Sequence, residues 1–361
     1  MENTLKTTVN SRGIIVFYEM NDFYQKIILE KDCFICGAKK ESKVFNDEHI
    51  LPNWLLTKYK LHNKRITLPN LIGYKYSSYT ISCCKECNEA LSRHFEMPVS
   101  NLLKLPYKEL VEAILHDESY YQLLFEWCTL IYFKVQIKDT ELHWKLNKKE
   151  GIHSIGESYN WLEYHHIHCM LRRFHTGAFV DKRALGSFIL LPALEARGIE
   201  SFDIATHTKG QTIMIRVGGI CIVCVLDDSH AASDLCRGTV RKFTNSLIPV
   251  QLREVFCHAT YINMNLKERP QYHSEYQHGT EKYFIRAAVP SYWNLFDKEY
   301  VQISIEELLE RYCGPMIGDR DDREHILEGL KAGKYNFLFN ENGHFLDYSN
   351  LSFFPDDPNT E

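Results

Sequence analysis

Residues 33–37 read Cys-Phe-Ile-Cys-Gly, and residues 84–88 read Cys-Lys-Glu-Cys-Asn. Two Cys-x-x-Cys pairs supply four thiolates, and the two-residue turn within each pair points both sulfur atoms to the same side. Four sulfur ligands suit one tetrahedral Zn²⁺ ion. The spacing therefore predicts a structural zinc site that is formed by four cysteines: Cys33, Cys36, Cys84 and Cys87.

A fifth cysteine, Cys83, directly precedes the second pair, and a Cys83-x3-Cys87 pair could also close around the metal. We favour Cys84 because its distance in sequence from Cys87 equals that between Cys33 and Cys36. The alternative for Cys83 is a buried apolar thiol at the end of a strand.

The sequence around these pairs is equally specific. Residues 46–56 read Asn-Asp-Glu-His-Ile-Leu-Pro-Asn-Trp-Leu-Leu, and residues 88–96 read Asn-Glu-Ala-Leu-Ser-Arg-His-Phe-Glu. An acidic residue, His, an apolar pair and Pro, with Cys-x-x-Cys-Gly before them and Cys-x-x-Cys-Asn after them, resemble the zinc-knuckle branch of the HNH, or His-Me finger, endonuclease family. The resemblance covers about residues 31–97.

The resemblance implies a ββα-metal fold, in which a hairpin carries the acidic residue and the histidine and a helix follows. One divalent cation, Mg²⁺ or Mn²⁺, is then held between them, and the zinc knuckle braces the whole. Position by position, His49 corresponds to the general base, Glu48 to a metal-ligating carboxylate and Asn88 to the helix residue that completes the cation site.

The same residues suit phosphodiester hydrolysis on chemical grounds. A base must deprotonate water, and histidine has the unperturbed pKa nearest neutrality, which suits His49. A hard cation with oxygen ligands, such as Glu48 and the Asn88 amide, stabilises the negative charge of the transition state. Since neighbouring strand residues point to opposite faces, Glu48 and His49 share this task only if the hairpin twists or ends there, as Pro52 indicates.

The helix after the second pair adds candidates. If residues 88–96 are helical, the Asn88 face passes near position 96, so Glu96 could reach the cation or orient His49, whereas His94 points elsewhere. The family often has a central Asn or His that ties down the loop, and spacing does not decide between Asn63 and Asn70.

The net charge of −5 is unevenly distributed. Residues 31–100 hold eleven basic and seven acidic side chains, a net charge of +4, which leaves −9 for the rest. Within this segment Lys58, Lys60, Lys64 and Arg65, interleaved with Tyr59 and His62, could contact a phosphate backbone without reading its sequence. A solvated loop explains them equally well.

Length and composition set the wider frame. A chain of 361 residues with 45% hydrophobic and 25% charged residues is expected to fold, in two domains, rather than to be disordered. The apolar runs are too short to span a bilayer, and residues 1–10 lack the features of a secretory signal, so we expect a cytoplasmic protein without a membrane partner.

We expect an α+β chain with three parts: an N-terminal extension (1–30), a small zinc-stapled ββα-metal nuclease domain (31–100), and a larger α+β domain (101–361). Periodicity predicts one strand in the extension, and in the larger domain helices followed by mainly antiparallel strands. The helices are predicted at 101–115, 119–135, 158–174 and 303–312, and the strands at 13–18, 187–191, 201–205, 212–217 and 219–226.

Two further sets of residues have a spacing that could suit metal ligands. Cys221 and Cys224 have the Cys-x-x-Cys spacing, but they lie in an unbroken apolar run, which favours a buried strand. His165, His168, Cys169 and Arg172 would share one helix face; they could bind a metal or an RNA backbone, although a polar face between helices explains them as well.

These observations predict a metal-dependent HNH endonuclease that hydrolyses DNA, with RNA left open as a substrate. The 101–361 region is expected to engage substrate, to form a homodimer, to bind a protein partner or to regulate the nuclease. By analogy, a prokaryotic restriction or phage-defence setting fits this arrangement. The alternatives are a non-catalytic zinc-stabilised nucleic-acid-binding module and a nuclease effector gated by a sensor domain.

Overall fold

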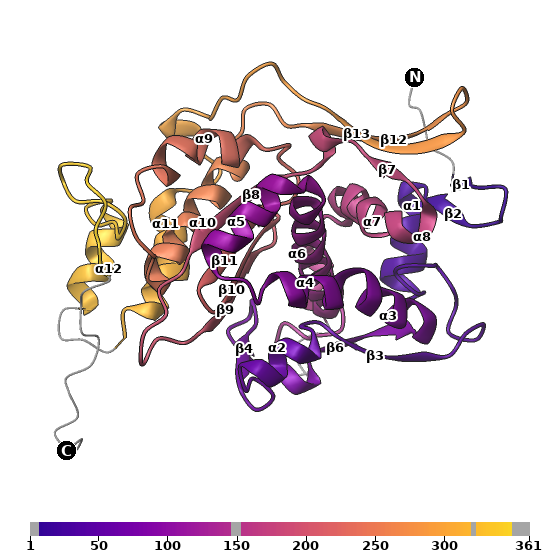
Figure 1. Ribbon diagram of the computed structural model, residues 1–361, viewed down its shortest axis with the longest axis horizontal. Coiled ribbons are helices and arrows are strands. Elements are labelled where there is room, and N and C mark those ends of the chain that lie inside the picture. Colours follow the sequence, from indigo (N-terminus) through magenta and orange to yellow (C-terminus); the bar gives the residue numbers. More distant parts are fainter. Residues whose placement is uncertain (1–6, 146–152, 319–322, 349–361) are drawn as a thin grey trace. The chain divides into compact units, whose positions relative to one another are not determined.

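The computed structural model describes residues 7–145, 153–318 and 323–348, and it is of the mixed α+β class that the sequence predicts (Figure 1). The chain divides into two compact units. Unit 1 comprises the described residues of Met1–Lys104, Asp117–Ala184 and Gln271–Ala288, and unit 2 those of Leu105–His116, Leu185–Pro270 and Val289–Glu361. The division expected from composition is a different partition of the chain and stays a prediction.

The segment with the two cysteine pairs forms a hairpin followed by a helix. Strands β3 (Phe45–His49) and β6 (Thr80–Cys84) are antiparallel, with Phe45 opposite Cys84 and His49 opposite Thr80. Helix α3 (Lys85–Leu91) follows β6 without a loop and packs on both strands. The order of these elements is therefore β, β, α.

An insertion separates the two strands of this hairpin. It contains helix α2 (Asn53–Lys58), the short antiparallel strands β4 (Arg65–Thr67) and β5 (Gly73–Lys75), and the 3-10 turn η2 (Tyr76–Ser78). Trp54 of α2 stacks on Trp127, with the ring centroids 6.5 Å apart, so the insertion is anchored inside unit 1.

After α3 the backbone stays helical through the π-helix η3 (Ser92–Glu96) and α4 (Met97–Leu102). The single helix predicted over 101–115 is wrong, because α4 ends at Leu102 and a second helix, α5 (Tyr107–His116), begins after Pro106. The cause is Pro106, which disfavours helical backbone at the residue before it and fits instead at a helix start.

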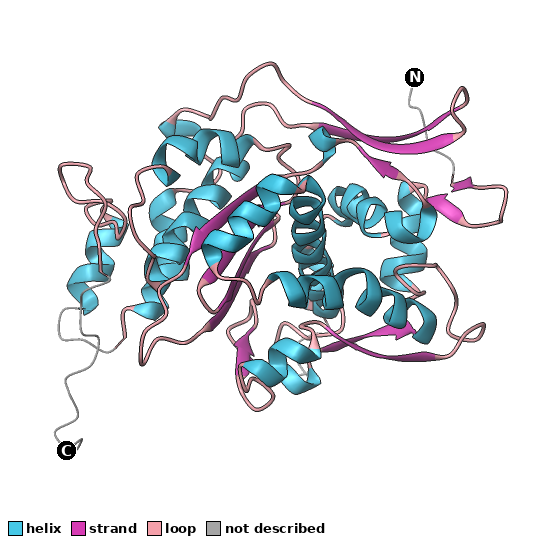
Figure 2. Ribbon diagram, viewed as in Figure 1, coloured by secondary structure: helices cyan, strands magenta, loops and turns pink. Residues whose placement is uncertain are grey.

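Helix α6 (Glu118–Asp139) confirms the helix predicted over 119–135. Every side chain from Leu124 to Asp139 is buried, so this helix has no solvent face over its last four turns. It contacts β6, η3, α4, α7 and the 3-10 turn η5 (Ile155–Ser158) within unit 1, which makes it the central helix of that unit (Figure 2). None of the helices in the described ranges is long and apolar enough to cross a membrane.

The helix predicted over 158–174 is interrupted. The turns η5 and η6 (Trp161–Tyr164) precede α7 (His165–Leu171), and α8 (Arg173–Thr176) follows it. Unit 1 also contains a three-stranded sheet in the order β12-β13-β7 and an N-terminal β1-β2 pair. The bounds of these elements and of the neighbouring helical turns are β1 (Thr8–Val9), β2 (Ile15–Phe17), α1 (Met20–Phe23), η1 (Tyr24–Leu29), β7 (Phe179–Val180), η7 (Lys182–Ala184), β12 (Gln271–Gln277) and β13 (Lys282–Ala288).

Unit 2 is built on an antiparallel sheet in the order β8-β11-β10-β9, and helix α10 packs against β10 and β11. Gly218, with φ of +60°, allows the tight turn between β10 and β11. The prediction of a buried strand at Cys221 and Cys224 is confirmed, because both are fully buried in β11. The bounds are β8 (Ser187–Pro192), β9 (Phe202–His207), β10 (Thr212–Val217), β11 (Ile220–Val225), α9 (Ala231–Val240), α10 (Pro249–Met264), η8 (Lys298–Tyr300), α11 (Ile305–Cys313), η9 (Gly314–Met316) and α12 (Arg323–Lys331).

Candidate functional site

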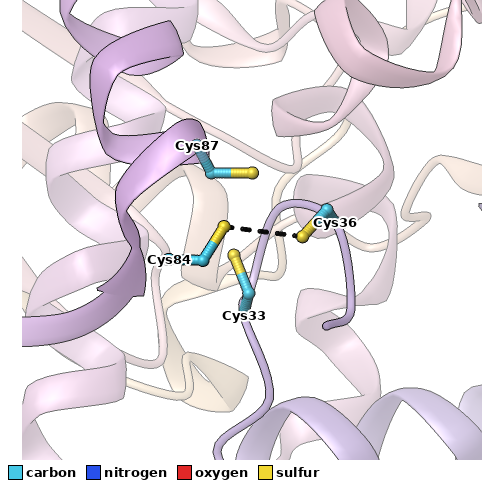
Figure 3. Close-up of side chains that lie close together, drawn as sticks. All are labelled: Cys33, Cys36, Cys84 and Cys87. Carbon is cyan, nitrogen blue, oxygen red and sulfur yellow. Dashed lines mark hydrogen bonds between the residues drawn. The ribbon is translucent and has the colours of Figure 1, made fainter. Parts of the chain in front are cut away.

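The two cysteine pairs meet in unit 1. The four sulfur atoms of Cys33, Cys36, Cys84 and Cys87 lie within 4.8 Å of one another, and Figure 3 shows the four side chains facing a common centre. Four sulfur atoms about 2.3 Å from a tetrahedral Zn²⁺ would lie about 3.8 Å apart, and the Cys36 and Cys84 sulfur atoms are 3.7 Å apart. The cluster could therefore hold one metal ion such as zinc.

Local structure explains how each pair is presented. Cys84 ends β6 and Cys87 lies in the first turn of α3, so the strand-to-helix junction brings them together. On the other side, the amide of Gly37 donates to the carbonyl of Cys33 and closes the turn. Gly37 has φ of +74°, and a Cβ atom there would lie 1.9 Å from the Tyr18 hydroxyl, so only glycine fits.

Cys83 lies beside the cluster and is not one of its four members. Its sulfur atom is 3.9 Å from that of Cys33, and its side chain is fully buried. Hydrogen bonds from Cys36, Cys83 and Cys87 lower the pKa of Cys33. The hydrogen bond to Cys33 raises the pKa of Cys36 to about 12. Cys33 is thus the preferred thiolate, and metal binding would release protons from the others.

Helix α7 supports the first cysteine turn through its polar face. His168 donates from Nε2 to the carbonyl of Phe34 at 2.8 Å, and Arg172 donates from Nε to the carbonyl of Ile35. Arg172 also reaches the carbonyls of Ile15 and Val16 in β2. The face from His165 to Arg172 therefore binds backbone carbonyls of unit 1, and it forms no metal cluster within the described ranges.

Glu48 and His49 occupy the end of β3. The Glu48 side chain is buried and its Oε1 atom is 2.7 Å from Nζ of Lys134, a residue of α6. The same ammonium group donates to the carbonyl oxygen of His49 at 2.6 Å. Lys134 is fully buried, so one cation fixes both the carboxylate and the backbone at the point where the strand ends.

The His49 imidazole is half-buried and has a free nitrogen. Its Nδ1 atom is buried and has no hydrogen-bond partner among the described residues. Burial is the largest cause of its lowered pKa, and the charges of Lys134 and His62 act in the same direction, whereas Glu48 opposes them. A neutral imidazole can accept a proton, which general base catalysis requires.

Asn88 lies in α3, and its amide nitrogen donates to Oδ1 of Asn46 at 3.1 Å. Asn46 and Glu48 are two residues apart in β3, so their side chains leave the same face of the strand about 7 Å apart. Asn88 therefore lies over the face of β3 that carries Glu48. Asn46 is a polar neighbour of this site that the motif comparison did not single out.

Glu96 ends the π-helical turn η3 and is half-buried. Burial raises its pKa, while the charge of Lys134 lowers it and the charge of Glu48 raises it, so its carboxyl group lies within electrostatic range of both. π-Helical turns are frequent at functional sites. His94 instead packs its ring on Phe174, with the centroids 4.9 Å apart.

The sequence did not indicate the role of Lys134 at this site, and it did not decide between Asn63 and Asn70. Lys134 escaped notice, and its only signal is a lysine within the apolar run Thr129 to Ile137. Between the candidates for the central position, Asn70 donates to the carbonyls of His143 and Trp144 and thus fastens the β4-β5 loop, whereas Asn63 is exposed.

Comparison of the chain with protein-family models, curated proteins and solved structures finds no match.

Proposed function

We propose that this protein is a metal-dependent HNH endonuclease that hydrolyses phosphodiester bonds in DNA. The observation that carries the proposal is the order β3, β6, α3, in which Glu48 and His49 end one strand and Asn88 follows the cysteine pair on the helix. The four-cysteine cluster at the base of that helix supports it, because a structural zinc ion would fix the helix against the hairpin.

In this proposal the His49 imidazole removes a proton from the attacking water. Lys134 keeps the carbonyl of His49 and the carboxylate of Glu48 in place, so the imidazole is presented from a fixed backbone. Glu48 and Asn88, with Glu96 nearby, supply oxygen ligands of the type that Mg²⁺ or Mn²⁺ prefers. The bound cation would stabilise charge on the phosphate and on the leaving 3′ oxygen.

The test is nicking of supercoiled plasmid by the purified protein with Mg²⁺, with Mn²⁺ and with a chelator. Wild type is expected to nick only with the divalent cation, and His49→Ala is expected to be slower by about 10²–10⁴-fold. His325→Ala is a matched control, because Glu-His-Ile-Leu recurs at 324–327 in α12, where it is expected to have no effect.

Equal nicking by wild type and His49→Ala would remove His49 as the base. Wild type that contains one zinc ion per chain and cleaves neither DNA nor RNA would contradict the proposed nuclease. Such a protein would instead support a zinc-stabilised binding module.

A further inference from the structure

The insertion between β3 and β6 has an unusual charge pattern. From His49 to Lys85 the chain contains no Asp or Glu. The same segment contains six cationic side chains: Lys58, Lys60, Lys64, Arg65, Lys75 and Lys85. All six are exposed. With histidine counted as neutral, all charged side chains of this segment are therefore positive, in a chain whose net charge is −5.

The fold brings two of these cations together. Arg65 and Lys75 are directly opposite each other in the β4-β5 pair, and like charges in that position destabilise a two-stranded sheet. The Arg65 guanidinium is held by a hydrogen bond from Nη1 to the carbonyl of Gly73 at 2.8 Å. No described carboxylate forms an ion pair with Lys58, Lys60, Arg65 or Lys75. The positive charge of these four residues is therefore available to an external anion.

The insertion begins beside the proposed catalytic residues. Helix α2 starts at Asn53, four residues after His49. His62 follows this helix, and its Nε2 atom lies 3.3 Å from Oδ1 of Asn53. Stacking of Trp54 on Trp127 anchors this arrangement to α6.

We propose that the exposed cations Lys58, Lys60, Arg65 and Lys75, here called the basic insertion surface, bind the phosphate backbone of duplex DNA beside His49. This inference rests on the proposed function, since it assigns a role in substrate binding to residues outside the ββα order. Lysine and arginine contacts to phosphate give affinity without sequence preference.

Duplex DNA fits this surface better than a single strand does. Proteins that bind unpaired strands offer exposed aromatic rings on which bases stack. The tyrosines of the insertion are instead half-buried or buried, and Tyr74 and Tyr79 pack their rings on each other 5.7 Å apart. The surface therefore offers charge for a backbone and little for an unstacked base.

The test measures binding by fluorescence anisotropy with a labelled 20-bp DNA duplex, without added divalent cation, from 50 to 200 mM salt. In the test variant Lys58, Lys60, Arg65 and Lys75 are changed to Gln. Each phosphate contact contributes about 0.9 to the slope of log K against log salt, so the slope should fall by about 3.6. Across this fourfold salt range, wild type should then lose about 150-fold more affinity than the variant.

Two controls define the result. Changing the exposed unit 2 cations Lys209, Arg241, Lys242 and Lys334 to Gln removes the same charge elsewhere, and the wild-type slope is expected to remain. A variant that exchanges lysine and arginine at the four positions of the basic insertion surface should also keep the slope. Folding of each variant is checked by its melting temperature and its zinc content.

An unchanged slope in the test variant, or an equal fall in the unit 2 control, would overturn the inference. Tighter binding of wild type to single-stranded DNA or to duplex RNA would overturn the choice of partner. Because binding is measured without added Mg²⁺ or Mn²⁺, these outcomes do not depend on cleavage. Conversely, equal nicking by wild type and His49→Ala would contradict the catalytic assignment while leaving the binding result in place.

Discussion

Replacing Lys134 by Met tests how the hairpin end is held. The Lys134 side chain is fully buried and the Glu48 side chain is 6% exposed, with 2.7 Å between Nζ and Oε1. Removing one member of a buried ion pair leaves the other charge uncompensated, which costs about 3–5 kcal/mol. The variant also loses the hydrogen bond to the carbonyl of His49. We expect the free energy of unfolding of unit 1 to fall by about 3–5 kcal/mol.

A double-mutant cycle separates the pair from general effects of packing. Glu48→Gln alone leaves a buried ammonium group without its counterion, whereas the double variant Lys134→Met with Glu48→Gln removes both charges. The loss of unfolding free energy in the double variant should therefore be much smaller than the sum of the losses in the two single variants. Lys138→Met is the matched control, because Lys138 lies one turn along the same helix in a less buried pair with Glu141. It is expected to cost about 1 kcal/mol or less.

The assay is urea unfolding followed by tryptophan fluorescence. Four of the five tryptophans, Trp54, Trp127, Trp144 and Trp161, belong to unit 1, so the signal reports mainly on that unit. Additive effects within about 0.5 kcal/mol would refute the reasoning, because they would mean that Lys134 and Glu48 do not interact. A loss for Lys138→Met as large as that for Lys134→Met would refute it as well.

Three other changes follow from the same unit. Burial raises the pKa of Asp139 to about 7, so the contribution of this carboxyl group to stability should be full below about pH 4 and be lost as pH rises to 7; Asp139→Asn, measured by urea unfolding at pH 4 and pH 8, should abolish a fall of up to about 4 kcal/mol. Gly37→Ala should lower the melting temperature more than Gly13→Ala does, because the two glycines share φ near +75° but nothing lies within 4 Å of a Cβ at Gly13. Cys84→Ser should lose the metal while Cys83→Ser keeps one ion per chain by native mass spectrometry, and equal metal content in the two would contradict the four-cysteine assignment.

The sequence predicted those features that depend on local spacing. Two Cys-x-x-Cys pairs indicate a cluster whatever lies between them. Periodicity located helices α6 and α11 and strands β8, β9, β10 and β11, but it missed the 16-residue helix α10 and the strands β12 and β13. The break at Pro106 was missed because the apolar periodicity continues across it, although the residue before a proline disfavours helix. The buried strand at Cys221 was recognisable because an unbroken apolar run has no solvent face.

What could not be predicted depends on residues far apart in the chain. Lys134 follows Glu48 by 86 residues, and nothing in either neighbourhood indicates that an ammonium group from one helix neutralises the carboxylate of a distant strand. The same is true of Arg172, which holds the carbonyl of Ile35 from 137 residues away. Spacing rules describe one turn or one strand at a time, whereas these contacts exist only after the chain has folded.

These contacts also bear on whether residues 31–100 form an autonomous domain. The first cysteine turn is held by His168 of α7 and by Arg172, which directly follows that helix. The proposed catalytic pair is held by Lys134 of α6, and all three residues lie outside the segment. If the segment were isolated, Glu48 would lose its counterion and two carbonyls of the cysteine turn would lose their donors. In such a fragment water would solvate these groups, and neither α6 nor α7 would fix their positions. A zinc ion could fix the cysteines of such a fragment, but the geometry of Glu48 and His49 depends on a helix that the resemblance to HNH endonucleases does not cover.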